Sequence, residues 1–177
     1  MKSKVIALSA ISSAIIAVLL TLGAYIEFID IFTLVVASIF VILPLYYKSY
    51  IGSILCYLSG GILAFLCSGF NVFSIIFPAY FGFAGLFPIF KCRMMDRKVN
   101  NALSKILGLI WCVVAFYGIY FYYIYIMNGV LDGLPEIIEK YLEIFVGVIG
   151  VLFYFIYDRF ILVMRLTFNR YLSRVIK

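Results

Sequence analysis

Long apolar runs, each about as long as a membrane-spanning helix, follow one another along this chain with only short polar breaks between them. A helix that crosses the hydrocarbon core of a bilayer needs roughly 20 mostly apolar residues. Because backbone in lipid has no water to pair with, such a span has to be helical. The runs therefore predict an all-α polytopic membrane protein, a bundle of six transmembrane helices. They cover roughly residues 5–24, 31–47, 50–69, 71–90, 103–127 and 138–164.

The six runs and the short breaks between them account for nearly all of the chain. Of its 177 residues, 67% are hydrophobic and only 12% are charged, which is far from the composition of a water-soluble domain. We therefore expect a single transmembrane domain over residues 1–177. The first run ends at Gly23-Ala24-Tyr25, before bulky and acidic residues, which makes a poor signal-peptide cleavage site. It is interpreted as a retained helix.

Lysine and arginine gather in alternate breaks, which indicates how the bundle is oriented. Short cytoplasmic loops collect these residues. With the N-terminus inside, all 14 basic residues except Lys140 fall on the cytoplasmic side, so both termini are predicted to be cytoplasmic. The basic side is explained by topology and contact with anionic lipid, and no loop is long enough to form a nucleic-acid groove. The outer side receives the acids Glu27, Asp30, Asp132, Glu136, Glu139 and Glu143.

Residues that carry catalysis or bind metals are scarce. The chain has no histidine, no glycine-rich phosphate loop and no paired-carboxylate spacing of the kind used by intramembrane proteases. No enzyme class, metal or cofactor is predicted. The cysteines have no metal-ligand spacing and are interpreted as packing residues. They are Cys56, Cys67, Cys92 and Cys112.

The outer parts of the last two runs offer candidates for a ligand site. Tyrosines crowd the fifth run, where they form either an interfacial belt or, for one or two of them, a stacking surface for a flat ligand. The sixth run begins amphipathic, and its acidic face lies either in the headgroup region or toward a water-filled cavity. The candidate ligand-binding residues are Glu27, Tyr117, Tyr120, Tyr123, Glu139 and Glu143.

Small residues form a stripe along the first run, and such stripes let two helices approach closely. The partner is either another helix of the same bundle or a helix of a separate subunit. The candidate docking residues are Ala7, Ala10, Ala14 and Ala17. Asp158 near the inner end of the sixth run also requires a partner. That partner is Arg159, a group on a neighbouring helix, or a cytoplasmic subunit.

Three stretches together resemble a known family. They are Lys4 with the alanine-rich residues that follow it to Ala17, the run Phe-Gly-Phe-Ala-Gly-Leu-Phe-Pro-Ile-Phe-Lys at residues 81–91, and Tyr157-Asp158-Arg159. In these features the chain resembles the substrate-binding S components of energy-coupling factor (ECF) transporters, in particular the small membrane proteins of Firmicutes grouped with them. The likeness covers nearly the whole chain.

The resemblance implies a six-helix bundle in the cell (inner) membrane that captures a vitamin or similar micronutrient from outside. Such a component topples against an ECF coupling transmembrane subunit, which two cytoplasmic ATPases drive, and it docks through the small-residue face of its first helix. Metal-ion members rely on histidines, which are absent here. Because Lys140 is the one outer cation, the charge pattern favours a neutral or cationic aromatic ligand.

A different class of function also accounts for the size and span count. A small polytopic scaffold protein of the cell-elongation machinery would bind protein partners and no small-molecule ligand. The two functions predict different outer halves of the bundle. A transporter component holds a pocket there, lined by the fifth and sixth helices, whereas a scaffold fills that space with its own side chains.

Overall fold

The structure, a computed structural model, describes residues 3–72, 74–126 and 136–175. Within these ranges, the side chains of residues 27, 126, 136–140, 169 and 171–175 are not described. The described residues form helices and no strand, which confirms the all-α prediction. Five helical stretches are long and apolar enough to cross a membrane, as expected of a membrane-embedded protein. They are Ser3–Tyr25, Asp30–Tyr47, Tyr50–Cys67, Asn101–Tyr125 and Tyr141–Phe168.

The first three spans pack closely because small side chains lie between them. Helices α1 (Ser3–Tyr25) and α3 (Tyr50–Cys67) meet at Gly60, where an added Cβ would lie 2.7 Å from the Cγ2 of Ile16. Beside this contact the hydroxyls of Ser13 and Ser59 hydrogen-bond at 2.7 Å. The small residues of α3 therefore serve internal packing. Helix α2 (Asp30–Phe40) packs against α1 and is followed by the short 3-10 helix η2 (Leu43–Tyr47), which has Pro44 in its first turn.

The fourth apolar run forms an interrupted helix rather than a uniform one. It consists of α4 (Ile76–Ala79), a π-helical turn η3 (Tyr80–Ala84) and α5 (Leu86–Asp96). The prediction of 71–90 was therefore wrong at both ends. Its end was misplaced because Lys91, which looks like the polar end of a span, is buried inside the bundle and the helix continues past it.

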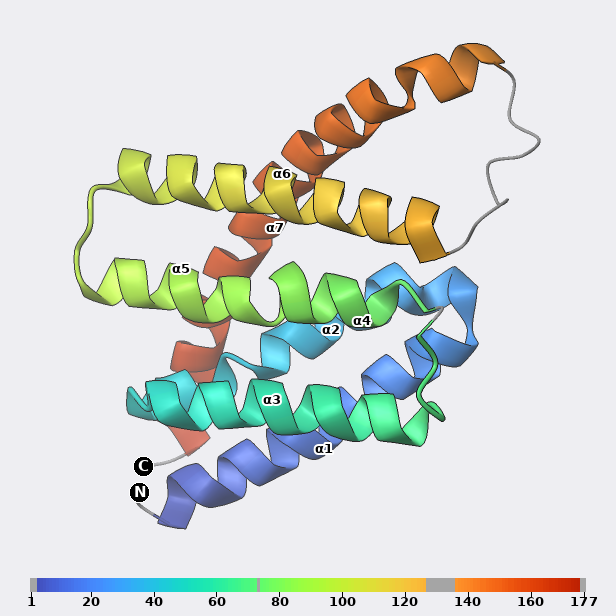
Figure 1. The fold of residues 1–177 in the computed structure, drawn as a ribbon. Coiled ribbons are helices and arrows are strands. Elements are labelled where there is room, and N and C mark those ends of the chain that lie inside the picture. The colour runs from blue at the N-terminus through green and yellow to red at the C-terminus, as the bar shows by residue number, and fades with distance from the viewer. Residues whose placement is uncertain (1–2, 73, 127–135, 176–177) are drawn as a thin grey trace.

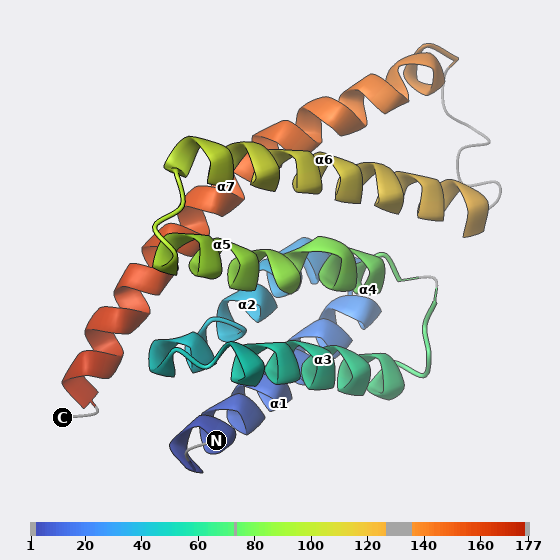
Figure 2. The same ribbon diagram turned by 60° about the vertical axis from the view of Figure 1, so that its left-hand side comes forward.

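The last two helices form a hairpin whose second arm is strongly tilted. Helix α6 (Asn101–Ile126) runs alongside α5, and α7 (Glu136–Val175) crosses the bundle obliquely (Figures 1 and 2). At 1.5 Å per residue, α7 is about 60 Å long, roughly twice the thickness of a hydrocarbon core. The prediction of 138–164 was too short because the helix continues through Arg165, which pairs with Asp96 of α5.

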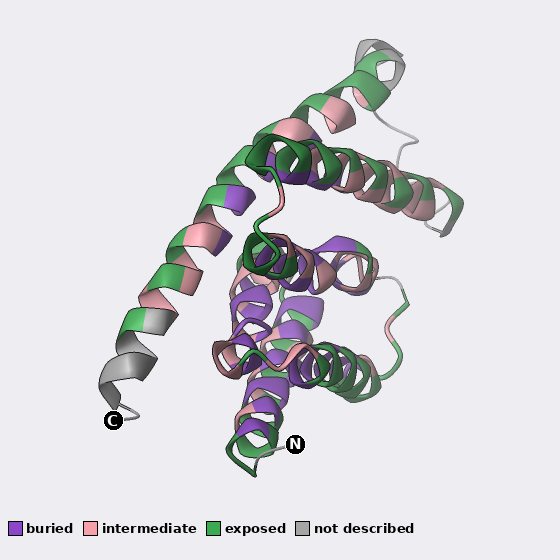
Figure 3. Ribbon diagram, turned by 90° about the vertical axis from the view of Figure 1, so that its left-hand side faces the viewer, coloured by how far each residue is buried: buried purple, intermediate pink, exposed green. Residues whose placement is uncertain are grey.

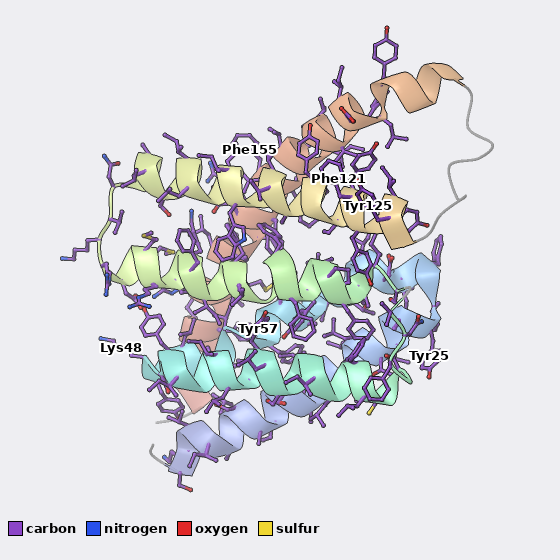
Figure 4. The ribbon with its side chains drawn as sticks, viewed as in Figure 1. Tyr25, Lys48, Tyr57, Phe121, Tyr125 and Phe155 are labelled. Carbon is purple, nitrogen blue, oxygen red and sulfur yellow. The ribbon has the colours of Figure 1, made fainter. Side chains whose placement is uncertain are left out.

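Both chain ends lie at the same end of the bundle (Figure 1). The connection between η2 and α3 lies there too, with Lys48, whereas Tyr25 and Tyr125 lie at the opposite end (Figure 4). The connection from α5 to α6, with Arg97 and Lys98, lies at the same end as the chain termini (Figure 1). We call this end the basic end. The arrangement follows the separation of charge along the sequence.

Buried residues concentrate where α1 to α5 face one another, and the outward faces of α6 and α7 are exposed (Figure 3). One core cluster joins α1, α2 and α3 to the interrupted helix. A second joins η2 and the interrupted helix to α6 and α7 through Phe87, Tyr154 and Tyr157. Large apolar side chains cover much of the exterior. A surface of this kind is solvated by lipid chains rather than by water.

Candidate functional site

A partly open cavity of about 280 Å³ lies between α2, the interrupted helix, α6 and α7. Its lining consists of Asp30, the three phenylalanines Phe83, Phe116 and Phe153, and seven aliphatic side chains. Asp30 begins α2, so the cavity lies in the half of the bundle away from the basic end. Its volume is just below the range for small-molecule sites, about 300–1,000 Å³. The cavity can hold a compact organic molecule.

The phenylalanines are held in place by packing with other rings. Phe83 is stacked on Phe87 with ring centroids 4.9 Å apart, and Phe153 is stacked on Tyr157 with centroids 5.4 Å apart. Phe116 of α6 contacts Phe153 of α7, again with centroids 5.4 Å apart. These neighbours fix the orientation of the rings. The cavity therefore has preformed aromatic walls.

Among the described residues, Asp30 is the one ionisable side chain that lines the cavity. The side-chain carboxylate of Asp30 accepts a hydrogen bond from the backbone N–H of Ile31. The backbone carbonyl of Asp30 accepts a second one from the hydroxyl of Thr33 at 2.9 Å. A carboxylate in the first turn is also favoured by the helix dipole. The charge is thus placed and held at the start of α2, where the span begins.

The π-helical turn is supported by side chains from three other helices. The N–H of Gly85 donates to the carbonyl of Tyr80, five residues back, at 2.9 Å. Tyr57 of α3 donates to the carbonyl of Phe81 at 2.9 Å, and Trp111 of α6 donates to that of Gly82 at 3.0 Å. The turn is therefore a junction of the bundle, and such turns often accompany functional sites.

The third donor to this turn is Tyr157 of α7, whose hydroxyl donates to the carbonyl of Ala84 at 2.9 Å. Pro88 has no N–H to offer this carbonyl four residues before it. Tyr157 supplies a hydrogen bond in its place. The sequence alone predicts the unpaired carbonyl, because Pro88 lies in an apolar helical run. It does not predict which side chain donates to that carbonyl.

A buried ion pair joins two of the stretches singled out in the sequence. Lys91 Nζ of α5 and Asp158 Oδ1 of α7 are 2.6 Å apart, and their side chains are 2% and 5% exposed. Of the partners considered for Asp158, the structure shows a neighbouring helix. Beyond this contact, neither atom has a hydrogen-bond partner among the described residues. Each charge therefore depends on the other for its compensation.

A second ion pair links the same two helices closer to the basic end. Asp96 of α5 pairs with Arg165 of α7 and also accepts a hydrogen bond from the hydroxyl of Tyr50. Burial alone would raise the pKa of Asp96. The hydrogen bonds from Tyr50 and Arg165 outweigh it and hold the pKa of this carboxyl below its usual value. Together the two pairs fix α7 against α5.

None of the candidate ligand residues with a described side chain lines the cavity. Tyr117 donates from its hydroxyl to the backbone carbonyl of Glu143 at 3.0 Å and so ties α6 to α7. The side chain of Glu143 is exposed, whereas Tyr120 and Tyr123 are half-buried. The side chains of Glu27 and Glu139 lie outside the described set. Sequence reasoning placed Asp30 among the outer acids but not among the candidate ligand residues. The other cavity residues are apolar, and in the sequence nothing distinguishes them from packing residues.

The alanine stripe of α1 divides between two environments. Ala7, Ala10 and Ala14 are exposed on the exterior of the bundle, whereas Ala17 is buried inside it. Only the first three form a continuous external stripe, and Ala17 is not available to a separate subunit. One narrow face of α1 thus presents small side chains that no described part of the chain covers.

Comparison with known proteins adds no family assignment. The chain matches no family model, no curated protein and no solved structure. The features that bear on function are therefore the sequence motifs, the cavity, the ion pairs and the exposed stripe of α1.

Proposed function

We propose that this protein is the substrate-capture (S) component of an ECF-type importer for a vitamin or similar micronutrient in the cell (inner) membrane. The observation that carries the proposal is the cavity between α2, the interrupted helix, α6 and α7. An S component requires such a site in the outer half of its bundle. The ligand is a small neutral or cationic aromatic molecule, in keeping with the three phenylalanines and Asp30.

The proposal includes a sixth span and a cytoplasmic position for both termini. The interrupted helix from α4 to α5 is about 30 Å long at 1.5 Å per residue, enough to cross a hydrocarbon core. Together with the five other spans it gives an even number of crossings. The basic end then faces the cytoplasm by the positive-inside rule.

The exposed stripe of Ala7, Ala10 and Ala14 is the proposed docking surface for the ECF coupling subunit, which two cytoplasmic ATPases drive. Small side chains let a partner helix approach closely, and in lipid this close packing replaces the hydrophobic effect as the driving force. The stripe is exposed on the exterior of the bundle, as docking requires. Ala17, being buried, is not part of the proposed surface.

Co-purification tests the proposal. The tagged chain is expressed with an ECF coupling module, and recovery of the ATPases is measured. We expect Ala10→Trp and Ala14→Trp to abolish recovery, because an indole on the stripe would hold the partner helix away. Ile106→Trp, on a lipid-facing position of α6, is the matched control and leaves recovery unchanged. Recovery that survives both alanine substitutions would exclude this docking surface, and no recovery with the wild-type chain would count against the transporter function.

The alternative is a scaffold protein of the cell-elongation machinery. That function requires no cavity, and a scaffold is expected to fill the outer half of its bundle with its own side chains. The apolar cavity between α2 and α7 favours the transporter over the scaffold. The same co-purification separates the two, since a scaffold has no reason to retain the ATPases.

A further inference from the structure

We infer that the cavity binds an apolar molecule with a cationic head group, and that this ligand enters from the lipid through the opening between α2 and α7. The inference concerns the same cavity as the proposed function and deepens it by naming the class of ligand and the route of entry.

The lining excludes a strongly polar ligand. Apart from Asp30, every described lining residue is aliphatic or a phenylalanine, with no tyrosine, serine, asparagine, glutamine, lysine or arginine among them. A molecule with several hydrogen-bonding groups would leave its water partners and find none in the cavity, which is costly for each group. The body of the ligand is therefore apolar, and the walls of Phe83, Phe116 and Phe153 suit a flat ring.

The rim of the cavity faces the acyl chains of the bilayer. Ile31 of α2 and Ile149 of α7 both line the cavity, and their side chains are 64% and 54% exposed. Both residues lie within membrane spans, Asp30–Tyr47 and Tyr141–Phe168. An exposed isoleucine within a span contacts lipid rather than water. An opening bordered by these two side chains is thus an entry from the bilayer.

Asp30 gives the bound molecule its direction. It is the first residue of its span, so its carboxylate lies where the hydrocarbon core ends, whereas the phenylalanines lie deeper. A molecule with an apolar body and a cationic head is oriented in the same way by the bilayer itself. Its body would lie against the rings, and its ammonium would donate to the carboxylate in a charge-assisted hydrogen bond. An anionic head would be repelled.

Three probes of equal shape and different charge test the inference. They are 2-(2-naphthyl)ethylamine, 2-(2-naphthyl)ethanol and 2-naphthylacetate, measured by equilibrium dialysis against the full chain in nanodiscs, with empty nanodiscs subtracted. We expect the amine to bind about tenfold more tightly than the alcohol, as one charge-assisted hydrogen bond provides. The acetate is expected not to bind. Acetate binding as tight as that of the amine would overturn the inference.

Substitutions locate the site. Asp30→Asn keeps a side-chain oxygen at the start of α2 and is expected to reduce amine affinity about tenfold, to that of the alcohol. Ile119→Phe fills the cavity from α6 and abolishes binding of both, whereas Ile110→Phe, a lipid-facing control on α6, leaves binding unchanged. If Ile119→Phe does not fold, Ala79→Leu fills the cavity from α4. Amine binding unaffected by Asp30→Asn, or by filling the cavity, would overturn the inference.

Two sources supply this chemistry, an aminolipid of the membrane or a lipid-soluble amine, and the lipid composition distinguishes them. Phosphatidylglycerol nanodiscs are compared with ones that also contain phosphatidylethanolamine. If phosphatidylethanolamine competes with the amine probe, the natural ligand is an aminolipid. If it does not compete, the natural ligand is a lipid-soluble amine. Both results support the inferred chemistry. The dialysis needs no coupling subunit. Failure of probe binding with intact ATPase recovery would therefore overturn this inference and leave the proposed function standing.

Discussion

At the scale of single residues, the charges inside the bundle act in pairs between α5 and α7. Lys91 and Asp158 are both buried, whereas Asp96 and Arg165 lie closer to the basic end and are more exposed. A buried charge is tolerated when its partner is present, and removing one member leaves the other uncompensated. The two pairs therefore differ in what their loss should cost.

Lys91→Met is expected to destabilise the bundle strongly, by about 3–5 kcal/mol, because it leaves the Asp158 carboxylate buried without its cation. The double variant Lys91→Met/Asp158→Leu removes both charges and should recover most of this loss. Reversible unfolding in mixed detergent micelles measures both values. A double variant no more stable than the single one would show that the pair does not explain the burial of Lys91.

Asp96 predicts a dependence of stability on acid pH. Its pKa is lower in the folded state than in the unfolded chain, so its contribution is fully present above the unfolded value of about 3.9. The contribution is lost as the pH falls through the folded pKa. We expect the Tm of the wild-type chain to exceed that of Asp96→Asn at pH 6 and the gap to close below about pH 4. A gap independent of pH would show that the carboxylate charge contributes nothing.

At the scale of elements, the interrupted helix is the centre of the bundle. Its π-helical turn receives hydrogen bonds from α3, α6 and α7, and Phe83 within the turn lines the cavity. Gly85 allows this packing, because a side chain there would overlap the ring of Tyr57. A helix without the π-helical turn would place Phe83 on a different face.

A double-mutant cycle tests the link between Tyr157 and Pro88. Tyr157→Phe removes the donor to the Ala84 carbonyl and is expected to cost about 1 kcal/mol. In a Pro88→Ala background the new backbone N–H can serve that carbonyl, so the same substitution should cost less. Equilibrium unfolding of the four proteins gives the coupling. Equal costs in both backgrounds would mean that the hydroxyl does not replace the missing N–H.

At the scale of the whole molecule, the two ends of the bundle differ in charge and, under the proposed topology, face different compartments. Cys67 is exposed at the end of α3 away from the basic end, whereas Cys56, Cys92 and Cys112 are buried. Arg97, between α5 and α6, is exposed at the basic end. The native cysteine thus offers a test of orientation.

A membrane-impermeant maleimide should label Cys67 on intact cells and give no signal with Cys67→Ser. In the Cys67→Ser background, Arg97→Cys is expected to react only after permeabilisation, because its loop faces the cytoplasm in the proposed topology. The extent of labelling is measured by mass shift on a gel. Labelling of Arg97→Cys on intact cells would invert the orientation or remove one of the six spans.

The sequence by itself determined the all-helical class, the apolar spans and the separation of charge between the two ends. These properties depend on local composition and on residues close together along the chain, so a one-dimensional pattern carries them. The ends of the fourth and sixth helices were mispredicted, because Lys91 and Arg165 looked like polar residues that end a span. Each is instead paired with an acid on another helix, and its own helix continues past it.

Only the tertiary structure decided which residues form the cavity and which group neutralises Asp158. Phe83, Phe116 and Phe153 come from three helices, and each looks like an ordinary packing residue in its own run. Whether an apolar side chain packs against its neighbours or lines a cavity depends on the distances between helices. Those distances are set by contacts between residues far apart in sequence, which the pattern along one helix does not contain.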